Sequence, residues 1–325
     1  MRSLILEFGT KGGVRMEMTN MFKTVSRKKL EELEHLSQLQ GTAQNEDGYL
    51  KTLVKRFLRD KLAVASLILF ILFIVIAVFA SAISPYDPTK TVGYFEAAPS
   101  AKNLLGTDEV GRDVLSRLIY GTRVSLIVGV LSVIIYAVIG TTLGLLSGFL
   151  GGIWDTTIMR ITEVFMSFPY FMVILVIVSL IGPSIWTVTF VIGLLGWPMI
   201  CRLVRGEVMK LKNADYVQAA IASGYTTFQI MFKHIFPNIL TLILVNMTFG
   251  VATSIITEAS LSFLGVGVQP PTSSWGNMMS NAQSLNVLQN QYWRWLPAGI
   301  MVLLTVLSIN FIGDGLRKAI EGDMK

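Results

Sequence analysis

The residues whose types and spacing suggest specific chemistry form a polar segment, residues 213–238, between two long apolar runs. Its first part favours a helix, for which Asn213 or Asp215 could serve as the N-cap. Gly224 then permits a break, and a following helix would enter the second apolar run near Pro237. The first helix carries small side chains that would fit closely into a groove of a soluble partner: Ala219, Ala220 and Ala222. The segment therefore predicts noncovalent contact with another protein; the alternative is a simple amphipathic connector.

Signatures of catalysis are absent from the sequence. It contains no G-x-x-x-x-G-K-[ST] phosphate loop, no H-E-x-x-H zinc motif and no C-x-x-C pair. His35 and His234 lie in different polar segments without companion ligands, and the single cysteine, Cys201, cannot form an internal disulfide. We therefore predict no catalytic residue, no metal site and no cofactor bound by this chain, which cannot hydrolyse ATP by itself.

The composition is typical of a membrane protein. Hydrophobic residues make up 52% of the chain and charged residues only 15%, whereas a soluble domain carries about 25% charged residues. The net charge of +6 is concentrated near the ends of apolar runs. This location favours membrane topology and anionic lipid over nucleic acid as its explanation. We predict an all-α, polytopic membrane protein.

Six spans are predicted, at about residues 62–83, 124–148, 164–181, 185–203, 235–257 and 295–313. Two of them come from residues 164–201, where 38 positions carry no charge. At about 1.5 Å per residue, this stretch is too long for one crossing. Gly182, Pro183 and Ser184 near its middle would end one helix and start the next. We expect residues 62–318 to form the membrane domain, with residues 207–234 as its long polar loop.

Lysine and arginine residues set the expected orientation of the spans. If both termini lie in the cytosol, 21 of the 27 lysines and arginines fall on the cytosolic side. The loop 84–123 is more basic than an outer loop usually is, and nothing in the composition explains this. We predict a multi-pass protein of a bacterial cell membrane, with its N- and C-termini and residues 207–234 in the cytosol.

Residues 1–61 are predicted to form a cytosolic tail that ends in an interfacial helix. Leu50, Leu53, Val54, Phe57 and Leu58 recur at helical spacing, and basic residues lie largely on the other face. This pattern suits an amphipathic helix on the inner membrane surface. The alternative is an ordinary positively charged flank of the first span. A short helix is predicted around residues 27–39, and we assign residues 1–46 no function.

Gly140, Gly144 and Gly148 lie four residues apart in the second predicted span. The three therefore share one face of the helix, where another helix backbone can approach closely. Helix packing is the preferred interpretation. The alternative is that this bare backbone lines the path of a substrate.

Four segments together resemble the permease subunits of ABC importers. The polar segment is similar to the family's cytoplasmic coupling loop in the spacing of Gln218-Ala219-Ala220, Gly224 and Ile235-Phe236-Pro237. Residues 105–125 and 258–276 closely resemble external segments of the second permease subunit of peptide and nickel importers. Around the third span the matching positions are Asp155, Met159, Arg160, Glu163 and Pro169, although aspartate is usual at position 163. The resemblance covers about residues 50–320 and is to the type with an N-terminal extension.

The resemblance implies a permease subunit of a bacterial ATP-driven importer for oligopeptides or dipeptides. A homologous permease would complete the translocation path, two ATPase subunits binding ATP and Mg would sit on the cytosolic loop, and an extracellular substrate-binding protein would deliver the peptide. The ATPase-coupling residues would be Asp215, Tyr216, Gln218, Ala219, Ala220, Gly224 and Pro237. Gln218 departs from the glutamate usual in the family, so a charge-assisted bond to an ATPase arginine would become a neutral one. Substrate-binding residues stay unassigned.

Several polar residues outside the coupling loop have structural interpretations. Arg112 and Asp113 are expected to cap short helices and pair with neighbours rather than to bind substrate. Arg160 and Glu163, three residues apart, predict a local ion pair. Trp275 suggests a stiff outer loop at the membrane interface, which the resemblance associates with the binding protein.

Two other functions remain open. A nickel or metal-chelate importer would share these permease motifs. An ion-coupled transporter or channel belongs to a different class. The charge-free stretches, residues 62–83, 124–153, 164–201, 235–257 and 295–313, contain no Asp, Glu, Lys, Arg or His, which argues against a proton or charge relay.

Overall fold

The structure is a computed structural model that describes residues 46–321, which form helices and loops without a β-sheet. The chain divides into two compact units, residues 1–56 and 57–325. The described part of the first unit, residues 46–56, makes up all but the last residue of α2 (Glu46–Phe57), where the amphipathic helix was expected. Its place on a membrane surface stays a prediction. The predicted helix around residues 27–39 lies outside the described residues.

The second unit consists almost entirely of helices. Their bounds are α3 Lys61–Val78, α4 Ala80–Ile83, α5 Val114–Leu150, α6 Gly152–Ser167, α7 Tyr170–Ile181, α8 Ile185–Leu195, α9 Trp197–Lys212, α10 Asp215–Ala222, α11 Thr227–Gln229, a π-helix Ile230–Ile235, α12 Phe236–Phe263, α13 Trp275–Met279, α14 Leu285–Asn290 and α15 Leu296–Glu321. Two 3-10 turns, Ser280–Gln283 and Tyr292–Arg294, flank α14.

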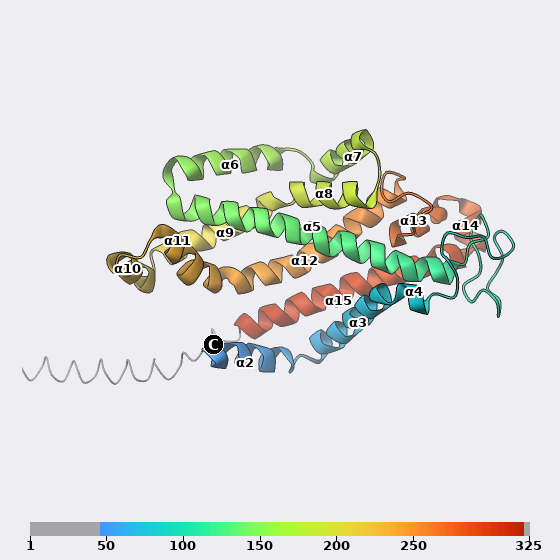
Figure 1. The fold of residues 1–325 in the computed structure, drawn as a ribbon, viewed down its shortest axis with the longest axis horizontal. Coiled ribbons are helices and arrows are strands. Elements are labelled where there is room, and N and C mark those ends of the chain that lie inside the picture. Colours follow the sequence, from blue (N-terminus) through green and yellow to red (C-terminus); the bar gives the residue numbers. More distant parts are fainter. Residues whose placement is uncertain (1–45, 322–325) are drawn as a thin grey trace, which may run out of the picture. The chain divides into compact units, whose positions relative to one another are not determined.

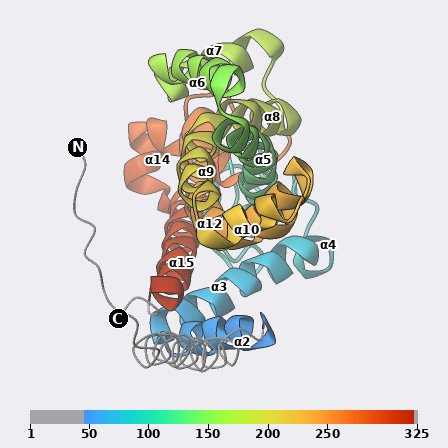
Figure 2. The ribbon, with the colours of Figure 1, turned by 90° about the vertical axis from the view of Figure 1, so that its left-hand side faces the viewer.

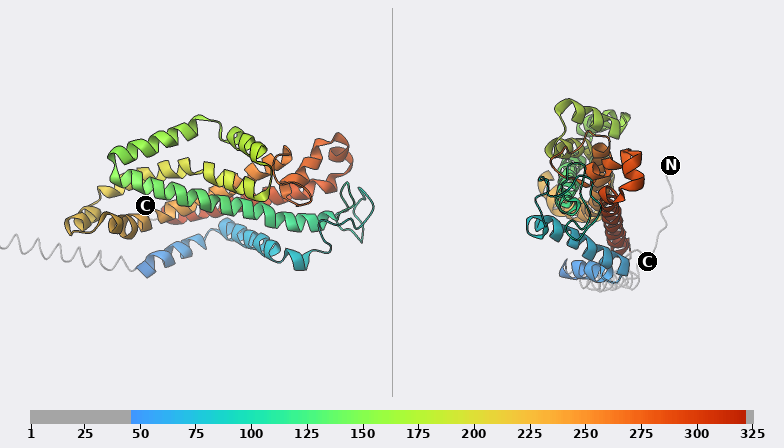
Figure 3. Two further views of the ribbon diagram at one scale, coloured as in Figure 1. Left: turned by 45° about the horizontal axis from the view of Figure 1, so that its top comes forward. Right: turned by 90° about the vertical axis from the view of Figure 1, so that its right-hand side faces the viewer.

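Five helical stretches of the described residues are long and apolar enough to cross a membrane. They are Lys61–Val78, Val114–Leu150, Ile185–Lys212, Thr227–Phe263 and Leu296–Ile320. A sixth crossing would combine α6 and α7, which bend by 81° at the break between them. Figure 3 (left) shows these helices as the two limbs of the bend. A third span made of α6 and α7 would therefore begin at Gly152 and contain a sharp bend, whereas the sequence predicts a span over residues 164–181.

Proline explains the bend between α6 and α7. Pro169 has no amide hydrogen for a helical bond, and the residue before a proline prefers an extended backbone. Helix α6 is helical up to Ser167 and ends at Phe168, whose ψ of 144° is extended. The next turn lies where the sequence predicts it. Gly182 has φ +106°, and the Ser184 side chain accepts a hydrogen bond from the Thr187 amide at the start of α8.

Helix α5 lies at the centre of the unit and contacts α3, α8, α9 and α12 (Figure 1). It begins ten residues before the predicted span because its arginines find partners within the protein. The guanidinium of Arg123 donates to the carbonyls of Ala77 and Val78 at 2.7 and 2.9 Å. The Asp113 side chain caps the helix by accepting from the Ser116 amide at 2.8 Å, which confirms its expected capping role.

The structure places Gly140, Gly144 and Gly148 along the contact between α5 and α9. A Cβ atom on Gly140 would lie 2.7 Å from the Trp197 carbonyl oxygen, and one on Gly144 would lie 2.7 Å from that of Cys201. At Gly148 the nearest atom would be the Val208 Cβ, at 2.8 Å. Because real Cβ atoms do not approach this closely, the two helices could not keep this spacing with larger residues.

Helices α3 and α15 pack against each other and are joined near one end by an ion pair. The Lys318 ammonium lies 2.9 Å from the Asp60 carboxylate, which also caps α3. The hydrogen bond from Lys318, together with those from the Ala63 and Leu62 amides, lowers the pKa of the Asp60 carboxyl.

The two ends of this unit differ in what they carry, and we name them after their short helices. The α13 end holds the start of α5, the end of α12, the start of α15 and loops 84–113 and 264–295. The α10 end holds the ends of α5 and α9, with α10, α11 and the start of α12. Figure 2 views the unit from the α10 end, and the right panel of Figure 3 views it from the α13 end.

Candidate functional site

The polar segment forms the predicted helix, break and second helix at the α10 end. Gly224 has φ +80° with open space around it, so the break uses a backbone conformation that favours glycine. The N-cap of α10 is Ala214, without a side-chain bond, and the prediction of Asn213 or Asp215 at this position is wrong. Asn213 is instead the C-cap of α9, because α9 continues to Lys212 and leaves only a two-residue connection.

Helix α10 presents one face to its own chain and the other to solvent. Val217 and Ala220 are buried in a core cluster with residues of α5, α9 and α12. The exposed face carries Asp215, Tyr216, Gln218, Ala219, Ile221 and Ala222. Ala220 is therefore small because it packs inside the chain, and it does not lie on a surface that a partner could reach. The small residues open to a partner are Ala219 and Ala222.

Hydrogen bonds connect α10 to the end of α5. The Gln218 side-chain amide donates to the Lys212 carbonyl at 2.8 Å. The Lys212 ammonium in turn donates to the Phe149 carbonyl at 2.7 Å and lies 5.4 Å from the centre of its ring. A displacement of α10 would therefore act directly on the ends of α9 and α5.

The second helix of the segment begins with a capping box formed by Thr226 and Gln229. It then passes through the π-helix before Pro237, an exposed residue near the start of α12. Because Pro237 cannot donate an amide hydrogen, the helix before it can widen by one residue. Within this bend the Tyr225 ring meets the His234 ring edge-on, with centroids 5.3 Å apart.

Large apolar side chains are exposed over this segment. Tyr216, Ile221 and Tyr225 are each about two-fifths exposed, Phe232 is 45% exposed and Phe228 is 68% exposed. The rings of Phe228 and Phe232 stack with centroids 4.4 Å apart. We call these five residues the α10 surface. Exposed apolar side chains that gather on one segment are typical of a contact with another protein or with a membrane.

A carboxylate joins three helices near the α10 end, which the sequence reasoning did not foresee. Asp155 on α6 accepts from the Nε and Nη2 of Arg205 on α9, at 2.5 and 2.7 Å. It also accepts from the Ser147 hydroxyl on α5 at 2.5 Å. Arg160 and Glu163 form the predicted ion pair at 3.0 Å, with both side chains exposed.

At the α13 end, ion pairs tie two loops together. Arg294 has a side chain only 3% exposed and lies 2.9 Å from Glu96 and 2.5 Å from Glu109. Arg112 lies 2.7 Å from Asp108 and 3.0 Å from Glu109, which confirms that it pairs with neighbours. Loop 84–113 is thus fixed to the residues that precede α15.

Glu258 is a second residue that sequence reasoning missed as a site. It lies on α12 with no exposed surface, and its carboxylate accepts hydrogen bonds from Ser125 and Ser262 at 3.1 and 2.8 Å. The predicted span ended at residue 257, so Glu258 was placed in a loop motif, whereas α12 continues to Phe263. A signal was available, because Glu258 and Ser262 are four residues apart and share a helix face.

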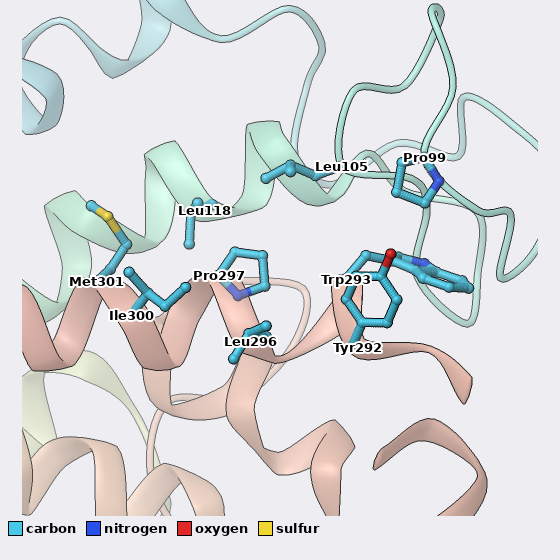
Figure 4. A pocket seen from close by; sticks show the side chains of 9 residues that line it. All are labelled: Pro99, Leu105, Leu118, Tyr292, Trp293, Leu296, Pro297, Ile300 and Met301. Carbon is cyan, nitrogen blue, oxygen red and sulfur yellow. The ribbon is translucent and has the colours of Figure 1, made fainter. Parts of the chain in front are cut away.

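A cavity of about 360 Å³ lies at the α13 end between loop 84–113 and the first turns of α5 and α15 (Figure 4). Its lining is almost wholly apolar and consists of Pro99, Leu105, Leu118, Tyr292, Trp293, Leu296, Pro297, Ile300 and Met301. Binding sites that fix the orientation of a polar ligand add a few placed polar groups. We therefore assign no peptide to this cavity. Among residues 46–321, no group of three or more His, Cys, Asp or Glu side chains could hold a metal ion.

Known families cover most of the chain. Residues 140–325 match the family of binding-protein-dependent transport system inner membrane components. Residues 48–103 match the N-terminal transmembrane domain of oligopeptide transport permease C.

Curated relatives match over nearly their whole length. The chain is 39% identical over 292 residues to a putative peptide permease of Brucella suis biovar 1, covering 88% of this chain and 96% of that protein. It is 37% identical over 279 residues to the dipeptide transport system permease DppC of Bacillus subtilis, covering 86% and 87%. It is 39% identical over 273 residues to the glutathione transport system permease GsiD of Pectobacterium atrosepticum, covering 83% and 90%.

A solved structure has a similar fold. The MetNI methionine ABC transporter in an inward-facing conformation contains a chain that matches with a TM-score of 0.50 at 21% identity. The match covers 62% of this chain and 96% of that one. This similarity concerns the fold alone.

Proposed function

Because this chain belongs to the family of binding-protein-dependent transport system inner membrane components, a family of ABC importer permeases, we propose that it moves oligopeptides or dipeptides across the inner membrane. The observation that carries this proposal is the identity of 37–39% to permeases named for peptides, dipeptides and glutathione. The matched segments include the domain named for oligopeptide permeases.

The chain works with other subunits. A second, homologous permease completes the path, and an extracellular binding protein delivers the substrate, as the family's description suggests. Two ATPase subunits bind ATP and Mg and hydrolyse ATP for the complex. The α10 end faces the cytosol and the α13 end faces outward, an orientation that the distribution of lysines and arginines supports.

The ATPase contact lies on the exposed face of α10 and the bend after it. Tyr216, Gln218 and Ala219 are exposed there, next to the break at Gly224. Asp215 and Pro237 mark the two ends of this contact. Ala220 contributes from inside, because it seats α10 on its own core. An exposed aromatic side chain such as Tyr216 is the type of residue that often dominates the binding energy of an interface.

Movement of the ATPases reaches the spans through the connections of α10. Closure of the ATPases on ATP displaces α10, and its bonds through Lys212 carry the displacement to the ends of α9 and α5. The π-helix carries it to α12. The spans thereby switch between an inward-open and an outward-open arrangement, and ATP favours one of them through differential contacts.

Reconstitution tests the function. The complex that copurifies with this tagged chain is placed in proteoliposomes with its binding protein and radiolabelled alanyl-alanine. We expect ATP-dependent dipeptide uptake by the complex and none by this chain alone. Uptake of nickel or a metal chelate in place of the dipeptide would identify the alternative importer. Uptake by the chain alone, driven by a proton gradient without ATP, would overturn the proposal.

Cysteine labelling tests the orientation. Tyr94→Cys lies at the α13 end and Lys210→Cys at the α10 end but outside the α10 surface, where the native side chains are 89% and 73% exposed. The native Cys201 is buried and does not compete. In intact cells an impermeant maleimide should label the first variant but not the second, and label both after lysis. The reverse pattern in intact cells would contradict the orientation.

A further inference from the structure

Glu258 is a fully buried carboxylate within a membrane-spanning helix, one turn before α12 ends at Phe263. Both of its oxygens accept hydrogen bonds from serine hydroxyls, from Ser262 on the same helix and from Ser125 on α5. Buried ionisable groups in such helices are costly to maintain and usually serve a function.

The two serines also connect Glu258 to the loop that follows α12. The Ser262 hydroxyl oxygen accepts from the Val268 amide at 3.0 Å, while that of Ser125 accepts from the Trp275 amide at 3.2 Å. Each serine hydroxyl thus donates a hydrogen bond to the carboxylate and accepts one from a backbone amide at an end of the segment 268–275. One carboxylate holds both ends of the segment 268–275.

This loop is seated without spare room. A Cβ atom on Gly267 would lie 2.1 Å from the Ser262 hydroxyl oxygen, and one on Gly276 would lie 2.6 Å from the Ser262 Cβ. Trp275 is fully buried, with its ring against that of Phe73 on α3. The segment is therefore fixed to the bundle at the α13 end.

In this arrangement both oxygens of Glu258 accept a hydrogen bond. A carboxamide accepts at its oxygen but donates at its nitrogen, so one serine would lose the acceptor of its hydroxyl proton. Within residues 46–321 no cation is ion-paired with Glu258. The arginines at this end of α5 are engaged elsewhere, since Arg117 lies 3.4 Å from Asp108 and Arg123 donates to two carbonyls in the last turn of α3.

We propose that Glu258 is a positioning residue for transport, which holds residues 265–276 as a rigid part of the surface that receives the substrate-loaded binding protein. This inference rests on the proposed function and on the outward orientation of the α13 end. It assigns to Glu258 no contact with the substrate. A loosened loop should lower the affinity for the loaded binding protein more than it lowers the ATPase rate of the complex once the binding protein is bound.

The test uses the complete transporter in proteoliposomes, with ATPase activity measured against rising concentrations of binding protein loaded with alanyl-alanine. Glu258→Gln keeps the shape of the side chain. We expect the concentration for half-maximal stimulation to rise roughly tenfold, with the maximal rate retained. Ser125→Ala and Ser262→Ala should each shift it in the same direction by a smaller factor. Ser260→Ala is the matched control, because within the described residues its hydroxyl bonds only to the Ile256 carbonyl of its own helix.

Hydrogen exchange supplies an independent measurement on the same complexes. In Glu258→Gln the amides of Val268 and Trp275 should exchange about tenfold faster, while those in the middle of α12 stay protected as in the wild type. If the concentration of binding protein for half-maximal stimulation is unchanged in Glu258→Gln, with or without faster exchange, the inference is overturned. The inference would also be overturned if Glu258→Gln, Ser125→Ala and Ser262→Ala all lost maximal rate in proportion to the amount of assembled complex, because such a loss indicates a folding defect. If the wild-type complex shows no stimulation by loaded binding protein, the proposed function itself fails.

Discussion

The α13 end and the α10 end of the same bundle satisfy their side chains in different ways. At the α13 end, charged and polar groups from distant parts of the chain are buried against each other, as in the contacts of Arg294 and Glu258. At the α10 end, the long-range contacts of Asp155 and Lys212 stand beside many polar contacts between residues only a few positions apart, and aromatic rings such as Phe228 are exposed.

This difference indicates where each end obtains its stability. Buried polar groups need partners, and the α13 end provides them within the chain. Apolar surface gains stability only when it is covered, and the α10 surface is uncovered in the isolated chain. We infer that the α13 end keeps its conformation by itself, whereas the α10 end reaches its working conformation together with a partner.

Arg294→Met should give the largest effect, because it removes the buried centre of the ion-pair cluster. Glu96 would lose its ion-pair partner and Glu109 would keep only Arg112, although both carboxylates are nearly half exposed and can regain water. We expect a loss of about 2–3 kcal/mol of stability, measured by thermal unfolding of the purified complex. Lys210→Met is the matched control at the α10 end. The Lys210 side chain is 73% exposed, so its ion pair with Glu207 should contribute less than about 1 kcal/mol to stability.

Gly276→Ala and Gly206→Ala compare how tightly the backbone is packed at the two ends. A Cβ on Gly276 would lie 2.7 Å from the Ala259 Cα, so we expect a loss of about 1–3 kcal/mol. Gly206→Ala on α9 meets no atom within 4 Å and should raise stability by up to about 1 kcal/mol. Melting temperatures of the two variants measure this contrast. Equal melting temperatures would mean that the α13 end is not more tightly packed.

Tyr216→Ser tests whether the α10 surface needs a partner. Because its side chain is 43% exposed in the isolated chain, stability of the permease should change by less than about 0.5 kcal/mol. Association with the ATPase should weaken by about 1–2 kcal/mol, which pull-down titration measures. Val217→Ser, directed into the core, should instead lower stability of the permease itself. Wild-type ATPase binding by Tyr216→Ser would exclude Tyr216 from the contact.

Gln218→Glu should give the smallest change. The carboxylate cannot donate to the Lys212 carbonyl, so α10 loses one exposed hydrogen bond. A charge-assisted bond to an ATPase arginine would offset this loss, and we expect ATPase association to strengthen by less than about 1 kcal/mol. The titration should be repeated at high salt, which removes most of an exposed charge effect. A strengthening that high salt leaves unchanged would contradict the arginine contact.

Several parts of the fold could be predicted because they depend on residues close in sequence. Long apolar runs predict where the chain crosses the membrane, and the ion pair of Arg160 with Glu163 needs only one helical turn. The break at Gly224 and the turn at Gly182 both have positive φ, which glycine permits in any fold. The family resemblance was also contained in local motifs.

The tertiary structure decided the features that depend on distant partners. Helix α5 starts at Val114 because Arg123 finds carbonyls of residues 77 and 78, which hydropathy does not reveal. Ala220 faces its own core and not a partner, since packing against α9 and the π-helix fixes the rotation of α10. Glu258 is buried because Ser125, 133 residues earlier in the chain, completes its hydrogen bonds. Local sequence determines which elements can form, but only the packing of distant segments determines which of their faces and charges are covered.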